Sequence, residues 1–160
     1  MKRLPRHGAA GFTYIEMLVT AGLLAILASM VIPLVHWDDK RRREGRLRLT
    51  LQQMRGAIDQ YHRYVEEGLI VQSDVEQMGY PLTLDELVDG IDVSDPTTAE
   101  VKVVRFLQRM PIDPITGDTE WGQRSYQDDW DSTSWGRENV YDVYSLSPAR
   151  ALDGTYYRDW

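Results

Sequence analysis

Cysteine and any excess of positive charge are missing from this sequence. Because none of the 160 residues is cysteine, the chain can form no disulfide and no cysteine-ligated metal site. Acidic residues outnumber basic ones by 25 to 18, which gives a formal net charge of −7. A general nucleic-acid binder needs a basic surface for the phosphates, so this charge balance argues against nucleic acid as a partner.

Motifs of the common enzyme classes are also absent. The sequence has no glycine-rich phosphate loop, no nucleophile elbow and no histidine pair at metal-ligand spacing. His7 lies near the N-terminus, and His36 and His62 lie in a segment that we predict to be helical. We therefore predict that the protein is not an enzyme.

A long uncharged run dominates the N-terminal part of the chain. No charged side chain occurs from Met17 to Val35, and Leu, Ile, Val, Ala and Met predominate there. At about 1.5 Å per residue, a helix of this length approaches the roughly 30 Å hydrocarbon thickness of a bilayer. A short basic segment precedes it. The pattern predicts a hydrophobic transmembrane helix over this run.

One carboxylate, Glu16, stands at the start of this apolar run. An unpaired carboxylate in lipid costs at least a few kcal/mol, so Glu16 is expected to have a partner. The segment Gly-Phe-Thr-Tyr-Ile-Glu at 11–16, followed by the long apolar helix, resembles the class III signal of type IV pilins and type II secretion pseudopilins.

The resemblance implies a cleaved leader at residues 1–11, a hydrophobic transmembrane helix at residues 12–35 and specific roles for three residues of the motif. A prepilin peptidase would cut between Gly11 and Phe12 and methylate the new Phe12 amine, and glycine would let the protease approach the backbone closely. Glu16 would then pair with the Phe12 amine of a neighbouring subunit, because two opposite charges desolvated together lose less than either alone. Pro33 corresponds to a position where the family carries a helix-kinking proline.

Simpler interpretations of the same segment exist. A secretory signal peptide has an apolar region of about 7–15 residues and a small-residue cleavage site after it. Here the run is longer, and residues 33–37 offer no such site. A plain single-pass anchor would not need the Gly-Phe-Thr-x-x-Glu motif. Pro33 could also be a membrane-helix proline that neighbouring helices tolerate.

After the apolar run the pattern becomes amphipathic. Large apolar residues recur at steps of three and four, at Leu47, Leu51, Met54, Ile58, Tyr61 and Val65. Intervening polar residues such as Arg55 are expected to face away from this stripe. We predict one helix from about Thr13 to Glu67 that ends at Gly68, with residues 36–67 as its amphipathic continuation and 68–160 as a periplasmic head.

A charged collar at residues 38–48 joins the apolar and amphipathic segments. It carries more basic residues than the leader, against the positive-inside tendency, but the family resemblance places the leader inside. We interpret the collar as a solvated helix surface, with contact to lipid phosphates or to acidic surfaces of neighbours as the alternative.

The head is predicted to combine short helices and strands. Residues 81–87 indicate a helix opened by Thr83, with Glu86 completing a capping box, while 101–107 fits either a strand or a helical turn. Candidate strands, rich in aromatic and β-branched residues, are Trp121–Tyr126, Val140–Leu146 and Thr155–Arg158. We predict an α+β, pilin-like fold with a small antiparallel sheet of about three strands packed on the helix.

The C-terminal half resembles the heads of type II secretion major pseudopilins. Residues 111–114 (Pro-Ile-Asp-Pro) and 141–146 (Tyr-Asp-Val-Tyr-Ser-Leu) carry the resemblance, which implies calcium binding in the loop that follows. The Leu146 carbonyl, Ser147 and Asp153 would be the ligands. Calcium takes six to eight oxygens, whereas this loop has one carboxylate and the cation Arg150, so weak binding or none is expected.

Two further surfaces of the head have functional and structural interpretations. The acidic cluster at 128–131 could supply metal oxygens but lacks EF-hand spacing, and a solvated loop is the simpler interpretation. Trp130, Trp135 and Trp160 could line a sugar-binding surface, although tryptophans in a small head more often lie in the core or in subunit contacts.

The resemblance implies a structural subunit of a type II secretion pseudopilus in the bacterial inner membrane. Its expected partners are copies of itself in a homopolymeric fibre, minor pseudopilins, the prepilin peptidase and the inner-membrane assembly platform. A pilin or minor pilin of a type IV pilus is the alternative within the class. A membrane-anchored binding module is the alternative outside it.

Overall fold

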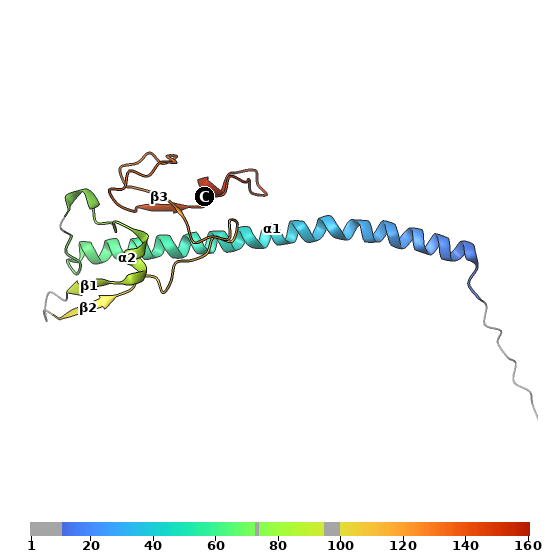
Figure 1. Cartoon of the computed structure of the whole chain (residues 1–160), viewed down its shortest axis with the longest axis horizontal. Helices are drawn as coiled ribbons and strands as arrows, with labels where there is room; N and C mark the ends of the chain where they lie inside the picture. Colours follow the sequence, from blue (N-terminus) through green and yellow to red (C-terminus); the bar gives the residue numbers. More distant parts are fainter. Residues whose placement is uncertain (1–10, 73, 95–99) are drawn as a thin grey trace, which may run out of the picture. The chain divides into compact units, whose positions relative to one another are not determined.

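The computed structural model describes residues 11–72, 74–94 and 100–160, except for the side chains of 29–36 (Figure 1). The chain divides into two compact units, Met1–Asp39 and Lys40–Trp160. Residues 1–10 of the predicted leader lie outside the described residues. Pro33 falls within the long helix, but its side chain is not among those described, and so its predicted kink is outside the description.

The first and longest element is the helix α1, Tyr14–Glu66. It ends in a C-terminal cap in which Gly68 has φ +72° and two backbone N–H groups, of Gly68 and Leu69, donate to the carbonyls of Val65 and Tyr64. Glycine adopts this left-handed conformation without steric cost. The predicted ends of the helix agree with the structure to within one residue on each side.

The core of the second unit forms on one face of α1. The predicted stripe is confirmed: its first five members are at most 4 % exposed, and Val65 packs partly buried against the same core. Ala57 joins it. Because burying each large apolar side chain stabilises by about 1.5–3 kcal/mol, this face supplies much of the energy that holds the head to the helix.

Two antiparallel strand pairs complete the second unit (Figure 1). Strand β1, Ile91–Ser94, pairs with β2, Val101–Val104, and strand β3, Gly122–Arg124, pairs with β4, Asp142–Tyr144. Val93 and Val143 point from these pairs into the core. The predicted α+β fold, a long helix packed with small antiparallel strands, is confirmed, but the strands form two separate two-stranded sheets in place of the predicted single sheet of about three strands.

The strands differ in detail from the prediction. Thr155–Arg158 forms no strand: it contributes one isolated bridge, Arg150 to Tyr156, and then the 3₁₀ helix η2, Tyr157–Asp159. The Asp153 carboxylate accepts hydrogen bonds from the Thr155 N–H and hydroxyl at 3.0 and 2.6 Å, which turns the chain there. Residues 101–104, for which the sequence left two possibilities, are a strand.

Two short helices lie within residues 75–89, and their capping also differs in part from the prediction. The 3₁₀ helix η1, Val75–Gln77, precedes the helix α2, Leu84–Asp89. Thr83 occupies the N-cap position of α2 as predicted, but its side chain makes no capping hydrogen bond. Glu86 accepts instead from the Leu82 N–H at 3.2 Å, so the predicted capping box does not form.

A buried carboxylate connects the two motifs that carry the head resemblance. Asp113 is fully buried, and its carboxylate accepts from the Ser145 hydroxyl at 2.5 Å and from the Ile115 N–H at 2.7 Å. The Ser145 hydroxyl in turn accepts from the Ser147 N–H. This chain of hydrogen bonds satisfies the buried polar groups and joins the proline-rich loop to the end of β4.

Candidate functional site

The first candidate site is the start of α1, where the processing and assembly residues were predicted. Glu16 lies in the first turn of the helix with its side chain exposed. Its backbone N–H donates to the Thr13 hydroxyl at 3.3 Å, which places Thr13 as the N-cap. Thr13 and Glu16, three residues apart, also match the sequence pattern of a capping box. This signal was present in the sequence, but the sequence analysis did not recognise it.

This geometry gives Glu16 two possible contributions. A carboxylate in the first turn interacts favourably with the helix dipole, typically by about 0.3–1 kcal/mol. This local stabilisation needs no partner, and an acidic residue in the first turn of any helix would provide it. The pairing with a neighbour's amine would come in addition, and the exposed side chain leaves the carboxylate accessible for it.

Around Glu16 the helix is covered with exposed apolar side chains. In the single chain each of the following is more than half exposed: Phe12, Tyr14, Ile15, Met17, Leu18, Val19, Leu23, Leu24, Ile26 and Leu27. Soluble monomers rarely expose contiguous apolar patches beyond a few hundred Å², so such a surface marks contact with protein or lipid. The described part of this segment thus has the surface of a helix whose contacts come from outside the chain.

Among the residues that the structure describes, no helix combines the length and the apolar character needed to cross a membrane. The predicted span at 12–35 includes residues 29–35, whose side chains are outside the description.

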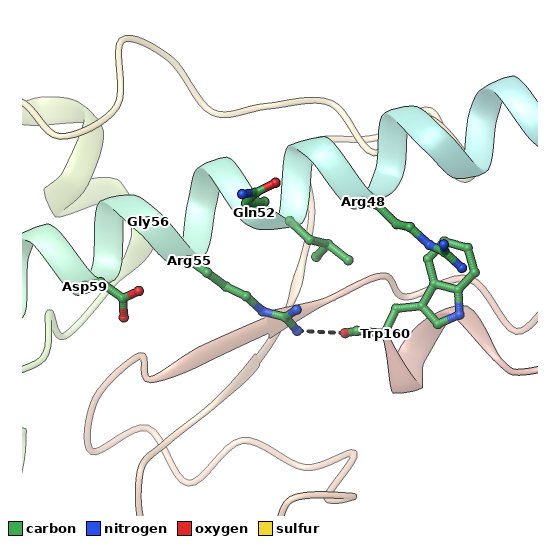
Figure 2. A pocket seen from close by; sticks show the side chains of 7 residues that line it. Arg48, Gln52, Arg55, Gly56, Asp59 and Trp160 are labelled. Atoms are coloured by element: carbon green, nitrogen blue, oxygen red, sulfur yellow. Dashed lines mark hydrogen bonds between the residues drawn. The ribbon is translucent and has the colours of Figure 1, made fainter.

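A second candidate site is a groove of about 570 Å³ along α1 in the head unit. Figure 2 shows Arg55 and Arg48 reaching from the helix toward the segment that ends in Trp160. The Arg48 guanidinium lies over the Trp160 ring at 4.2 Å and within 3.5 Å of the Asp153 carboxylate. The groove is therefore lined by charged groups, and most of these have partners inside the chain.

Arg55, one of the polar residues expected to face away from the apolar stripe, is half-buried and bound within the chain. Its guanidinium donates to both oxygens of Asp142, at 2.6 and 3.3 Å, to the Val143 carbonyl at 3.1 Å and to the Trp160 backbone oxygen at 2.7 Å (Figure 2). A forked, charge-assisted contact of this kind is among the stronger polar interactions in proteins. Arg55 is thus a structural residue that joins α1 to β4 and to the C-terminal segment.

Glu44, the single acid among the basic residues at 40–48, is also structural. Its side chain is buried, and one carboxylate oxygen accepts from the Leu152 N–H at 2.8 Å and from the Tyr157 hydroxyl at 2.9 Å. Burial, reinforced by the hydrogen bond to Glu44, raises the pKa of Tyr157 to about 12. The interpretation of the collar as solvated surface is therefore wrong for Glu44.

The predicted calcium loop is held by contacts within the protein. Leu146 is exposed and Ser147 is buried, while the Asp153 carboxylate binds Thr155, whose hydrogen bonds hold the pKa of Asp153 below its usual value. Arg150 donates to the Gly154 carbonyl at 3.2 Å. Within the described residues, no three acidic or histidine side chains converge as metal ligands. This donor set does not fit calcium, and we derive no role for the ion.

Comparison with known proteins gives two similar proteins, which share one name. The type II secretion system core protein G of Klebsiella pneumoniae is 26% identical over 141 residues, which cover 86% of this chain and 84% of the relative. The protein of the same name from Vibrio cholerae serotype O1 is 26% identical over 149 residues, covering 91% and 84%. No protein-family model matches the chain. No solved structure matches it. The chain is thus similar over most of its length to type II secretion system core protein G, which confirms the resemblance to the pseudopilin family.

Proposed function

We propose that this protein is a structural subunit of a type II secretion pseudopilus. The observation that carries the proposal is the exposed apolar surface of residues 12–28 with one accessible carboxylate, Glu16, at its start. A helix of this kind needs contacts from lipid or from other subunits. The similarity to type II secretion core protein G supports contact with other subunits in the functional state of the protein.

The proposed cycle begins with the subunit in the bacterial inner membrane and its head in the periplasm. Prepilin peptidase cuts between Gly11 and Phe12 and methylates the Phe12 amine. The assembly platform then moves the subunit into a helical fibre, where residues 12–35 exchange lipid for the helices of neighbouring copies. The fibre, with minor pseudopilins as further partners, drives secreted proteins outward.

The Glu16 carboxylate and the Phe12 amine of a neighbour set the axial register of this fibre. In an apolar surrounding an ammonium and a carboxylate attract strongly, and each is costly when left alone. A register shifted by one helical turn, about 5.4 Å, would separate the charges and bury both without a partner. The pair therefore favours one arrangement over all others, which a purely apolar contact could not do.

A type IV pilus subunit is the second candidate within the class, and the absence of cysteine argues weakly against it, because many such pilins close their C-terminal region with a disulfide. A membrane-anchored binding module is less well supported. Of the three tryptophans considered for a sugar surface, Trp130 is 84 % exposed, while Trp135 and Trp160 pack against the core. One exposed ring does not make a stacking platform. We propose no enzymatic activity and no metal requirement.

Mass spectrometry of the N-terminus of the protein isolated from membranes tests the proposed processing. We expect a chain that begins at N-methylated Phe12, because cleavage after Gly11 creates the amine that Glu16 needs. Gly11→Val is expected to block cleavage, and Gly22→Ala in the same helix, where a Cβ meets nothing within 4 Å, is the matched control. A mature chain that retains Met1 would instead indicate an uncleaved anchor.

A further inference from the structure

The basic residues of the helix at 40–48 include two whose charges are not used within the chain. Arg43 and Arg46 are exposed, and the described part of the chain supplies neither guanidinium with an ion pair. They lie three residues apart and so on the same face of α1, where like charges repel. In contrast, Arg48 and Arg55 of the same helix are held by Asp153 and Asp142.

The far end of the same helix shows the opposite arrangement. Glu66 is the last residue of α1 and Glu67 follows it, both exposed. Acidic groups at a helix C-terminus interact unfavourably with the negative end of the helix dipole. Glu66 has a partial partner in His62, at 3.5 Å, and Glu67 has none within the described residues. The helix therefore carries unfavourable charges in a single chain at two places, the basic pair in its interior at Arg43 and Arg46 and the acidic pair at its C-terminal end.

The sign of the charge separates sharply along the sequence. Residues 40–48 hold six basic side chains and one acidic, whereas residues 49–160 hold nine basic and 21 acidic. Local conflicts that are retained in a folded protein often mark interaction surfaces. Here one surface of the chain is complementary to another surface of the same chain, which is the condition for a head-to-tail contact between copies. Such contacts, when they do not close into a ring, build helical filaments.

We propose that Arg43 and Arg46 of one copy bind the acidic end of α1, at Glu66 and Glu67, in another copy. This inference rests on the proposed function, because it describes a contact within the fibre. Glu66 lies 20 residues beyond Arg46 on one helix, so at about 1.5 Å per residue the two copies are offset along their helices by about 30 Å. The contact is distinct from the pairing at Glu16 and acts between the heads.

Charge reversal in the full-length chain, in the cells that assemble it, tests the contact. Arg43→Glu/Arg46→Glu should lower the yield of sheared fibres about tenfold or more, because like charges would then face each other. Glu66→Arg/Glu67→Arg should do the same. A chain with all four reversals should recover most of the wild-type yield, since the contact is restored with its signs exchanged. Lys102→Glu/Arg109→Glu, also exposed, is the control with an equal change of net charge and an unchanged yield.

Each outcome decides the inference. If the reversed arginines leave the yield at the wild-type level, the contact does not exist. If they lower the yield but the fourfold variant does not recover, the arginines serve another partner such as anionic lipid headgroups, and the inference is overturned. Failure of the proposed function looks different, because then the wild-type chain itself forms no fibre.

Discussion

Replacing Glu16 with alanine is expected to lower the yield of sheared fibres at least about tenfold while the amount of protein in the membrane stays the same. The variant leaves the Phe12 amine of each neighbour without a counter-charge in an apolar surrounding. Breaking a buried ion pair by removing one partner costs about 3–5 kcal/mol, and a fibre repeats this cost at every subunit. Insertion depends on the apolar run and should not change.

Two variants separate pairing from helix capping, which the Thr13 contact makes a real alternative. Glu16→Gln keeps a side chain that suits a capping box but removes the charge, so it should assemble as poorly as Glu16→Ala. Thr13→Ala removes the cap, which costs about 1 kcal/mol of helix stability, but keeps the carboxylate and should assemble nearly normally. The opposite result, with Gln tolerated and Thr13→Ala defective, would assign Glu16 to helix initiation.

Removing the Glu44 carboxylate is expected to have the largest effect on the stability of the head. Glu44→Ala leaves the part-buried Leu152 N–H and the buried Tyr157 hydroxyl without their acceptor. An unsatisfied buried polar group costs about 1–3 kcal/mol, so we expect a loss of about 3 kcal/mol in the free energy of unfolding. Urea denaturation of the purified full-length chain in detergent measures it.

The controls for Glu44 are its neighbour and its partner. Arg43→Ala removes an exposed side chain from the same turn and should change the stability by less than about 0.5 kcal/mol. Tyr157→Phe removes one of the two donors and should cost less than Glu44→Ala; the double variant should cost less than the sum of the two. Additive costs, or a stable Glu44→Ala variant, would show that the Glu44 contact contributes little.

The same contact predicts a dependence on alkaline pH. The pKa of Tyr157 is raised from its ordinary value of 10.0 to about 12, so the folded state disfavours loss of the proton. The stability that this contact provides is therefore complete below about pH 10 and is lost as the pH rises toward 12. Tyr157→Phe should remove this part of the pH dependence.

The features of the fold that the sequence predicted correctly follow from local patterns of residues. The apolar stripe of residues 47–65 and the cap at Gly68 depend on helix geometry and on the conformational freedom of glycine, and both can be recognised without knowledge of the rest of the chain. The α+β class followed from one long amphipathic helix next to short aromatic segments. These features needed no long-range contact to be recognised.

The features that could not be predicted from the sequence depend on contacts between residues far apart in the chain. An acid among six basic residues looks solvated, and nothing near Glu44 indicates that Leu152 and Tyr157, more than a hundred positions away, will cover it. Arg55 likewise binds Asp142, 87 positions away. The segment at 155–158 has strand-forming residues, but the Asp153 side chain turns the chain before a ladder can extend. In each case tertiary contacts outweighed local preference.

The proposed function depends most on the contact between Glu16 and the Phe12 amine of another copy, and electron cryomicroscopy of sheared fibres tests this contact most directly. We predict a continuous map in which each Phe12 nitrogen lies within hydrogen-bond distance of a Glu16 carboxylate from a different subunit. A fibre in which the Glu16 carboxylate contacts only its own helix, with the Phe12 amine of the neighbouring subunit elsewhere, would contradict the proposed pairing.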